Sequence, residues 1–192
     1  MPSFGDPAAR LLVVGLAPGL AGANRTGRPF TGDYAGEILY PTLLRFGFAR
    51  GTYAARPDDG LELVDCRITN AVRCVPPQNR PTAAEIRTCR RFLAPELEAP
   101  PRPVVVLLLG RIAHDSVMRV LGLSPRAFPF RHGAVHDLPD GGPRLVASYH
   151  CSRYNIQTGT LTAAMFAEVV AGIRDFLDTA DIARRRAAVG RR

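Results

Sequence analysis

The sequence contains no lysine, no tryptophan and no apolar run that approaches the roughly 20 residues a membrane-spanning helix needs. A membrane span is therefore excluded. The first ten residues lack the charged and apolar regions of a signal peptide, which predicts a cytoplasmic protein. Because there is no P-loop lysine and no G-x-G-x-x-G spacing, a nucleotide- or phosphate-binding α/β enzyme is only a weak alternative.

Cysteine is scarce, with four residues in the chain: Cys66, Cys74, Cys89 and Cys151. No two of them form a C-x-x-C pair, so a self-contained zinc ribbon is not expected. Nothing indicates secretion, and disulfides are not expected in a cytoplasmic protein.

The basic residues are all arginines, and 25 of them against 17 acidic residues give a formal net charge of +8. Arginine binds phosphate with two parallel hydrogen bonds and stacks on bases, so the charge favours a nucleic-acid partner. A composition bias is the alternative explanation, because the chain also has 17 prolines and many alanines.

The segment 15–33 is rich in glycine and proline and follows the apolar run 11–14, which predicts a buried strand. The glycines and prolines exclude a helix interior. A strand that runs into such a loop and then a helix is where open α/β sheets bind ligands. The alternative is a long surface connection.

The rest of the chain alternates between strand and helix patterns, and we expect a single three-layer αβα domain over residues 1–180 with a central, mostly parallel sheet. An arginine-rich tail that frays is expected at 181–192. The expected elements are strands at 10–15, 61–69, 103–109, 135–138 and 145–149, and helices from Asp33 to Phe46 with a kink at Pro41, from Thr82 with a capping box to Glu85, after Gly110 and from Thr160.

Three loops follow predicted strands, at 15–33, 69–81 and 149–159, and parallel strands bring such loops to one edge of the sheet. We therefore expect one pocket that takes polar or aromatic side chains from all three loops: Asn24, Phe30, Asn70, His150 and Asn155. A lone asparagine or histidine is more often a turn former or a buried core group.

The same loops carry a family resemblance that covers nearly the whole chain. The segments GLAPG at 15–19, TGRPFTG at 26–32, ITNAVRC at 68–74 and HCSRYN at 150–155 resemble, in this order, the motifs of the uracil-DNA glycosylase superfamily, with family 5 as the nearest match. The resemblance implies the glycosylase-like fold and an enzyme that flips uracil, and other deaminated bases, out of DNA and hydrolyses the N-glycosidic bond to leave an abasic site.

The resemblance also implies roles for the loop residues. Phe30 would stack on the flipped base, and Asn70 would pair with uracil O4 and N3–H through its amide. His150 would stabilise the uracil anion by donating near O2, a catalytic contribution of about 3–4 kcal/mol by analogy with oxyanion holes. Backbone N–H groups of the first loop, at Ala17 and Gly19, complete the expected base-binding set.

The positions directly after the first strand are Leu16 and Ala17, so no carboxylate stands there. Family 5 is similar in this respect. The candidates to position the attacking water are Asn24 and Asn70, and Asp33 is either a third candidate or a helix cap.

The expected DNA-binding residues lie in the first and last loops: Arg25, Arg28, Ser152, Arg153, Tyr154 and Asn155. Arg153 and Tyr154 either enter the minor groove to fill the gap left by the flipped base or belong to an ordinary exposed loop.

Cys74 and Cys89 match the place where the resembling families hold two ligands of a [4Fe–4S] cluster, which needs four thiolates. The other pair would come from an N-terminal C-x-x-C region that precedes the first strand in those families. Since this sequence lacks that region, either the chain starts late or the member has lost the cluster; as a further alternative, both cysteines are apolar filler. No catalytic metal is expected.

Two functions compete at this point. One is a monomeric DNA-repair glycosylase acting on uracil-containing DNA. The other is a binding module of the same fold that recognises damaged or single-stranded DNA with little or no catalytic activity.

Overall fold

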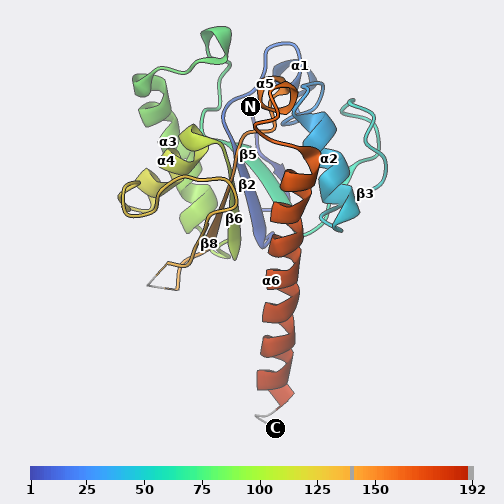
Figure 1. Cartoon of the computed structure of the whole chain (residues 1–192), viewed down its shortest axis with the longest axis vertical. Coiled ribbons are helices and arrows are strands. Elements are labelled where there is room, and N and C mark those ends of the chain that lie inside the picture. Colours follow the sequence, from blue (N-terminus) through green and yellow to red (C-terminus); the bar gives the residue numbers. More distant parts are fainter. Residues whose placement is uncertain (139–140, 190–192) are drawn as a thin grey trace.

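The computed structural model describes residues 1–138 and 141–189, with side chains described as far as residue 182. Its centre is a six-stranded sheet (Figure 1). The four inner strands are parallel and the two edge strands are antiparallel to their neighbours. In spatial order the strands are β1 (Phe4–Gly5), β5 (Cys66–Asn70), β2 (Leu11–Gly15), β6 (Val105–Leu109), β8 (Arg144–Ser148) and β7 (Val135–His136).

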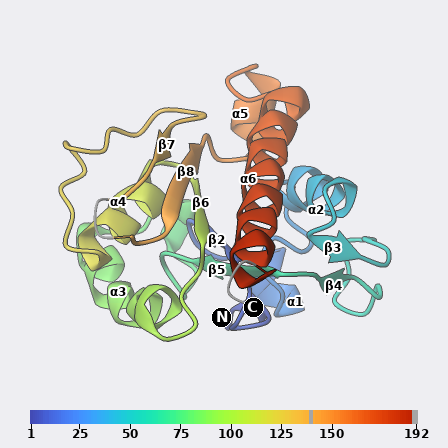
Figure 2. The same cartoon turned by 90° about the horizontal axis from the view of Figure 1, so that it is seen from below.

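Helices cover both faces of this sheet, as the view from below shows (Figure 2). One face packs on α2 (Gly36–Arg45) and α6 (Ala163–Val189), and the other on α3 (Ala83–Glu98) and α4 (Arg111–Val120). Strands β2 and β6 are buried over their whole length because apolar side chains point to both helical layers. The three-layer αβα fold expected from the sequence is confirmed.

The start of α3 follows its local sequence signal. Thr82 accepts a hydrogen bond from the Glu85 N–H while the Glu85 carboxylate accepts from the Thr82 N–H, so the predicted capping box is present. The last long helix, by contrast, begins at Ala163, and its first turn is capped by Thr162 and not by Thr160. The two threonines are two residues apart, and local pattern alone does not separate them.

The region expected to form one strand at 61–69 is broken. Residues Glu62–Leu63 form β4, which pairs with β3 (Ala49–Arg50) in a separate two-stranded ribbon. The break lies at Asp65, whose backbone is left-handed with φ 50°. Its carboxylate accepts hydrogen bonds from the N–H and Nε of Arg10, so this turn is fixed by a contact distant in the sequence.

The remaining corrections concern helices. The helix expected from Asp33 begins at Gly36 and runs through Pro41 without ending. The loops hold two short helices that were not expected, α1 (Ala23–Thr26) and α5 (Arg153–Gln157), and a 3₁₀ turn at Pro77–Asn79. The tail expected to fray from Asp181 continues α6 as far as Val189, because alanine and arginine favour helix there; residues 190–192 lie outside the described residues.

Helix α6 extends well beyond the body of the domain (Figure 1). Within the described residues no helix is long and apolar enough to cross a membrane.

Candidate active site

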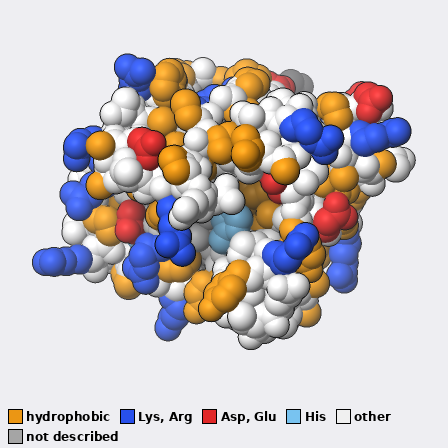
Figure 3. Space-filling view, turned by 90° about the horizontal axis from the view of Figure 1, so that it is seen from above, with side chains coloured by type: hydrophobic (Ala, Val, Ile, Leu, Met, Phe, Trp, Pro, Cys, Tyr) orange, Lys and Arg blue, Asp and Glu red, His pale blue; other side chains and the backbone are white. Residues whose placement is uncertain are grey.

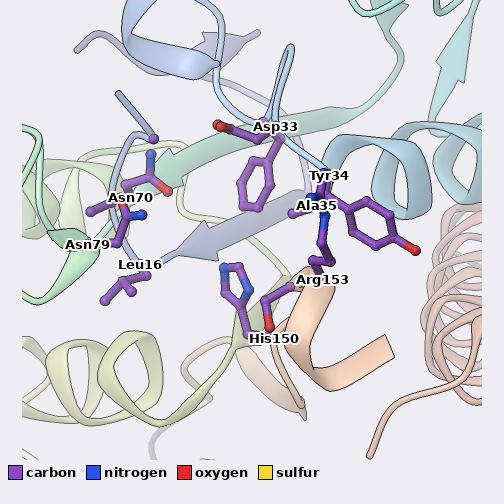
Figure 4. Close-up of a pocket in the computed structure, with 12 residues that line it drawn as sticks. Leu16, Asp33, Tyr34, Ala35, Asn70, Asn79, His150 and Arg153 are labelled. Carbon is purple, nitrogen blue, oxygen red and sulfur yellow. The ribbon is translucent and has the colours of Figure 1, made fainter. Parts of the chain in front are cut away.

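The loops that follow β2, β5 and β8 meet at one edge of the sheet and line a cavity of about 420 Å³. In the view onto this edge, a histidine side chain lies at the bottom of a hollow with arginine side chains around it (Figure 3). The close-up shows the His150 ring pointing into the pocket, with Asn70 on one side and Tyr34 and Arg153 on the other (Figure 4).

Phe30 forms one wall, and its position is conformationally demanding. The residue is buried and has a left-handed backbone with φ 59°, which is rare for an aromatic residue and is retained where surrounding contacts enforce it. The Tyr40 hydroxyl supplies one such contact by donating to the carbonyl of Pro29. The Phe30 and His150 rings are stacked, with centroids 6.1 Å apart and an interplanar angle of 27°. The expected convergence of these two residues is therefore observed.

Arg28, expected to bind DNA, is instead a buried anchor. It is 5% exposed, and its Nη1 and Nη2 each donate to a different oxygen of Asp59 at 2.8 Å. Its Nε donates to the Thr31 hydroxyl at 2.6 Å. The guanidinium holds the pKa of Asp59 well below its usual range. This pair ties the loop 15–33 to the loop 51–61, and its burial keeps Arg28 away from a phosphate at the surface.

Asn70 ends β5 and points into the pocket (Figure 4). It is 4% exposed, and its Oδ1 is buried without a hydrogen-bond partner among the described residues. Gly15, its neighbour on β2, explains how the side chain fits: a Cβ at Gly15 would overlap both Asn70 Oδ1 and the Phe30 ring. A buried acceptor without a partner is energetically unfavourable, so this oxygen is suited to a ligand N–H.

His150 follows β8 and stays partly open to the pocket. Its crowded surroundings desolvate the ring and lower its pKa to about 4, so the imidazole is neutral at pH 7. Asn155 donates from Nδ2 to the His150 carbonyl at 2.8 Å. Asn155 was expected to bind DNA, and one N–H of its amide is instead engaged in supporting the histidine.

Of the candidates to position water, Asp33 lies in the pocket and Asn24 does not. Asn24 is exposed on α1, outside the set of residues that line the pocket. Asp33 lines the pocket, and its Oδ2 accepts from the Ala23 N–H at 3.0 Å. It does not cap α2, whose N-cap is Ala35 without a side-chain bond. The carboxylate thus lies at the positive end of the short α1.

Ala17 and Gly19 line the pocket as expected. Sequence reasoning missed four further lining residues: Leu16, Tyr34, Ala35 and Asn79. Leu16 and Asn79 lie in loops that carry the motifs, and Tyr34 and Ala35 directly follow the first of these loops; no other local signal marks them. Asn79 has a left-handed backbone with φ 57°, which local sequence does not reveal in a proline-rich segment.

The mouth of the pocket carries exposed cationic and aromatic groups. Arg153 is exposed, with its Cζ 5.2 Å from the centre of the Tyr34 ring, and Tyr154 is 74% exposed. Arg25 is exposed on α1 and donates from Nε to the Ala21 carbonyl. Ser152 caps α5 by accepting from the Asn155 N–H, so its hydroxyl has a structural role.

The two cysteines expected to hold a cluster lie in neighbouring segments. Cys74 is exposed and Cys89 is buried on α3. Arg73, beside Cys74, donates to the Phe92 carbonyl and pairs with Glu96, both on α3. No group of three or more His, Cys, Asp or Glu side chains within the described residues is arranged to hold a metal. Two thiolates alone do not fit a [4Fe–4S] cluster, which needs four.

Comparison with known proteins places these features in context. The model of the uracil DNA glycosylase superfamily matches residues 2–174. The type-5 uracil-DNA glycosylase of Thermus thermophilus is 51% identical over 170 residues, which are 88% of this chain and 77% of that protein. The type-5 enzyme of Pyrobaculum aerophilum is 45% identical over 88% of this chain and 73% of its own. The type-4 enzyme of Archaeoglobus fulgidus is 32% identical over 78% of this chain and 69% of its own.

Proposed function

The chain belongs to the uracil-DNA glycosylase superfamily, and from that premise we propose how its pocket excises uracil from DNA. The protein is a DNA-repair hydrolase that cleaves the N-glycosidic bond of a flipped uracil and leaves an abasic site. Five relatives at 41–51% identity are named type-5 uracil-DNA glycosylases, and none of the five supports a module that only binds DNA.

The unpartnered Oδ1 of Asn70 is the observation that carries this proposal. Uracil presents an N–H donor at N3 beside an acceptor at O4, and an asparagine amide offers the complementary acceptor and donor. Cytosine has no N3–H and carries an amino group at C4, so it would leave the buried oxygen unsatisfied and set two donors against each other. Rejection of this kind is strong because an unpaired buried group costs about 1–3 kcal/mol.

Phe30 supplies the stacking surface for the same base. Its ring is buried and lies 6.1 Å from the His150 ring, centroid to centroid. A pyrimidine ring that stacks on Phe30 reaches Asn70 with one edge and His150 with another, because all three line the same cavity. Recognition by edge and by stacking is how enzymes bind bases taken out of the helix.

His150 stabilises the leaving group. When the C1′–N1 bond breaks, its electron pair goes to uracil and negative charge develops at O2. A neutral imidazole N–H can donate to O2 throughout, as a fixed donor in a water-poor site. Ala17 and Gly19 line the same pocket, and we propose that their backbone N–H groups add to this stabilisation. Water then adds to C1′ and loses a proton, and the uracil anion takes up a proton.

We assign the positioning of that water to Asp33, because Asn70, the other remaining candidate, holds N3 and O4 of the base, which lie across the ring from C1′. Asp33 lines the pocket, and among the described residues its side chain is the only carboxylate in the pocket lining. Asn24, which was a candidate from sequence, is exposed outside the cavity. The reaction is dissociative, so an oriented water with a nearby carboxylate meets its needs.

DNA is gripped at the mouth of the pocket. We propose that Arg25 and Arg153 contact phosphates and that Tyr154, three-quarters exposed at the start of α5, fills the gap left by the flipped base. Arg28 is excluded from this set because it is buried against Asp59. Ser152 and Asn155 hold the segment around His150 and act on DNA only indirectly.

An abasic-site assay tests the function. Duplexes with a single uracil or a single cytosine are incubated with the protein and the abasic product is cleaved by alkali. We expect product from uracil only, and Asn70→Ala should lower single-turnover excision by about 100-fold. Retention of uracil DNA without abasic product would favour the binding module instead. Duplexes with hypoxanthine in place of uracil test whether other deaminated bases are accepted.

We propose a [4Fe–4S] cluster only in a form of the protein that has two ligands in addition to Cys74 and Cys89. Met1 donates from its amino group to the carbonyl of Arg73, so residues added before Met1 emerge beside Cys74. A protein extended by a C-x-x-C segment should contain iron and absorb near roughly 400 nm, as thiolate-ligated iron–sulfur centres do. The same extension on a Cys89→Ser variant is the control. A colourless, iron-free extended protein would make both cysteines packing residues.

We further propose a monomer that acts in the cytoplasm. The support for the compartment is the proposed substrate, DNA, and the monomer is a prediction about the protein in solution. Sedimentation analysis tests the monomer: a dimer at micromolar concentration would contradict it.

A further inference from the structure

Strand β8 ends at Ser148, so the peptide groups of Tyr149 and His150 are not paired with a neighbouring strand. Side chains form hydrogen bonds with these peptide groups instead. Ser148 Oγ donates to the Tyr149 carbonyl at 2.9 Å. The Tyr149 N–H donates to Nδ1 of His132 at 3.3 Å. Asn155 Nδ2 donates to the His150 carbonyl at 2.8 Å. Buried peptide groups need such partners, and here they also hold the segment from both sides of His150.

His132 makes a second contact with the same residue. Its ring stacks on the Tyr149 ring with centroids 5.2 Å apart and an interplanar angle of 28°. It borders a separate cavity of about 300 Å³ between β8 and α6, outside the pocket that holds His150. The loop between α4 and β7 also brings Phe130 to 6.1 Å from Tyr149, ring centre to ring centre, so two aromatic side chains pack on this tyrosine.

The hydrogen bond determines the protonation state of His132. Because Nδ1 accepts from an N–H, it carries no proton, and the proton of the neutral ring lies on Nε2. Burial lowers the pKa of His132, while a backbone contact to Met165 and the charge of Glu168, both on α6, oppose this shift. The neutral form with an unprotonated Nδ1 is therefore the stable one at pH 7.

We propose that His132 is a positioning residue for His150. It acts through Tyr149, the residue before His150. The Nδ1 atom of His132 accepts a hydrogen bond from the Tyr149 N–H, and the His132 ring stacks on the Tyr149 ring. A donor that stabilises a developing anion must lie within a few tenths of an ångström of its best position. The inference rests on the proposed uracil excision and concerns the chemical step, because His132 is not among the residues that line the pocket.

Two substitutions separate the hydrogen bond from the packing. His132→Phe keeps a ring against Tyr149 but removes the acceptor, whereas His132→Asn keeps an acceptor near the position of Nδ1. We expect His132→Phe to slow single-turnover excision by about tenfold, with the Kd for DNA containing an uncleavable abasic analogue changed by less than about twofold. His132→Asn should restore the rate to within about threefold of the parent.

His136→Phe is the matched control. His136 lies on β7 and contacts the Phe128 ring edge-on, with ring centroids 5.5 Å apart. Its side chain does not take part in the hydrogen bonds that hold Ser148, Tyr149 and His150. It should excise at the parental rate. A His132→Phe protein that also excises at the parental rate, or a His132→Asn protein as slow as His132→Phe, would overturn the proposal.

A measurement on the unmodified protein covers the case in which the variants do not fold. In the ¹⁵N spectrum at pH 7, the His132 Nδ1 should show the signal of an unprotonated, hydrogen-bonded nitrogen, and Nε2 that of an N–H. A protonated Nδ1 would overturn the proposal. If the parent protein excises no uracil, the proposed function fails, but the nitrogen spectrum still decides whether His132 holds Tyr149.

Discussion

Replacing Asp59 by asparagine tests whether a buried ion pair far from the chemistry holds the first loop in place. The Asp59 side chain is fully buried, and it accepts from both terminal nitrogens of Arg28 and from the backbone N–H groups of Ala54 and Leu61. In the Asp59→Asn variant one of the two accepting oxygens becomes an NH₂ group, which can only donate. The Arg28 guanidinium would then lack a counterion among the aromatic rings that surround it, which belong to Phe4, Tyr40 and Tyr53.

The expected loss is large for one atom. Breaking a buried pair by removing one partner costs about 3–5 kcal/mol, and we expect about 3 kcal/mol because the loop 51–61 lies near the surface. In a domain of this length each kcal/mol shifts Tm by about 2–4 °C, so the predicted fall is about 6–12 °C. Excision should fall as well, because Arg28 lies two residues before Phe30.

The neighbouring carboxylate provides the control. Asp58 faces Arg56 at 3.6 Å with both side chains more than two-thirds exposed, so Asp58→Asn should cost less than about 0.5 kcal/mol. Thermal unfolding of both variants by circular dichroism is the measurement. The folded-state pKa of Asp59 lies below its ordinary value of 3.8, so its contribution is present above about pH 4 and is lost as the pH falls further. Equal Tm values for the two variants from pH 8 to pH 5 would refute the reasoning.

Further predictions concern the pocket. His150→Ala should lower single-turnover excision by about 100-fold while the Kd for DNA stays unchanged, and equal rates would remove the residue from the mechanism. The His150 ring resonances should not titrate between pH 8 and pH 5, because a pKa of about 4 leaves about 90% of the ring neutral at pH 5; titration near the ordinary value of 6.5 would contradict the burial argument. Gly15→Ala should displace Asn70 and Phe30 and reduce excision without unfolding the domain, and a crystal structure with both side chains unmoved would contradict the overlap. Asp33→Ala should slow excision by about tenfold or more because it orients the attacking water, and a parental rate would remove Asp33 from that role.

The sheet could be predicted from sequence because its signals are local and continuous. The apolar run at 103–109 contains all of β6, and the run at 11–14 all but the last residue of β2. The order of loops along the chain then placed Phe30, Asn70 and His150 at one edge, as observed. These residues could be found because each lies at a strand end or in the loop that follows one.

The errors fall where a distant partner decides the structure. The alternation at 61–69 looks like one strand, but Arg10 binds Asp65 from 55 positions away and fixes a turn there. Asn24 and Asp33 lie in one loop and both suit water positioning. Part of the loop forms α1, on which Asn24 is exposed. Asp33 folds back to the start of α1, where it accepts from the Ala23 N–H and lines the pocket.

Arginine shows why residue type alone does not assign a role in this chain. Arg25, Arg28 and Arg153 all lie in loops that resemble the family motifs, and each was a reasonable contact for phosphate. Arg28 differs because a carboxylate 31 positions later meets it inside the protein, with three aromatic rings around the guanidinium. In a chain whose every basic side chain other than histidine is an arginine, the position of the acidic partners decides which arginines remain for DNA. The Asp59→Asn variant examines that division directly, because it changes the carboxylate and leaves all 25 arginines in place.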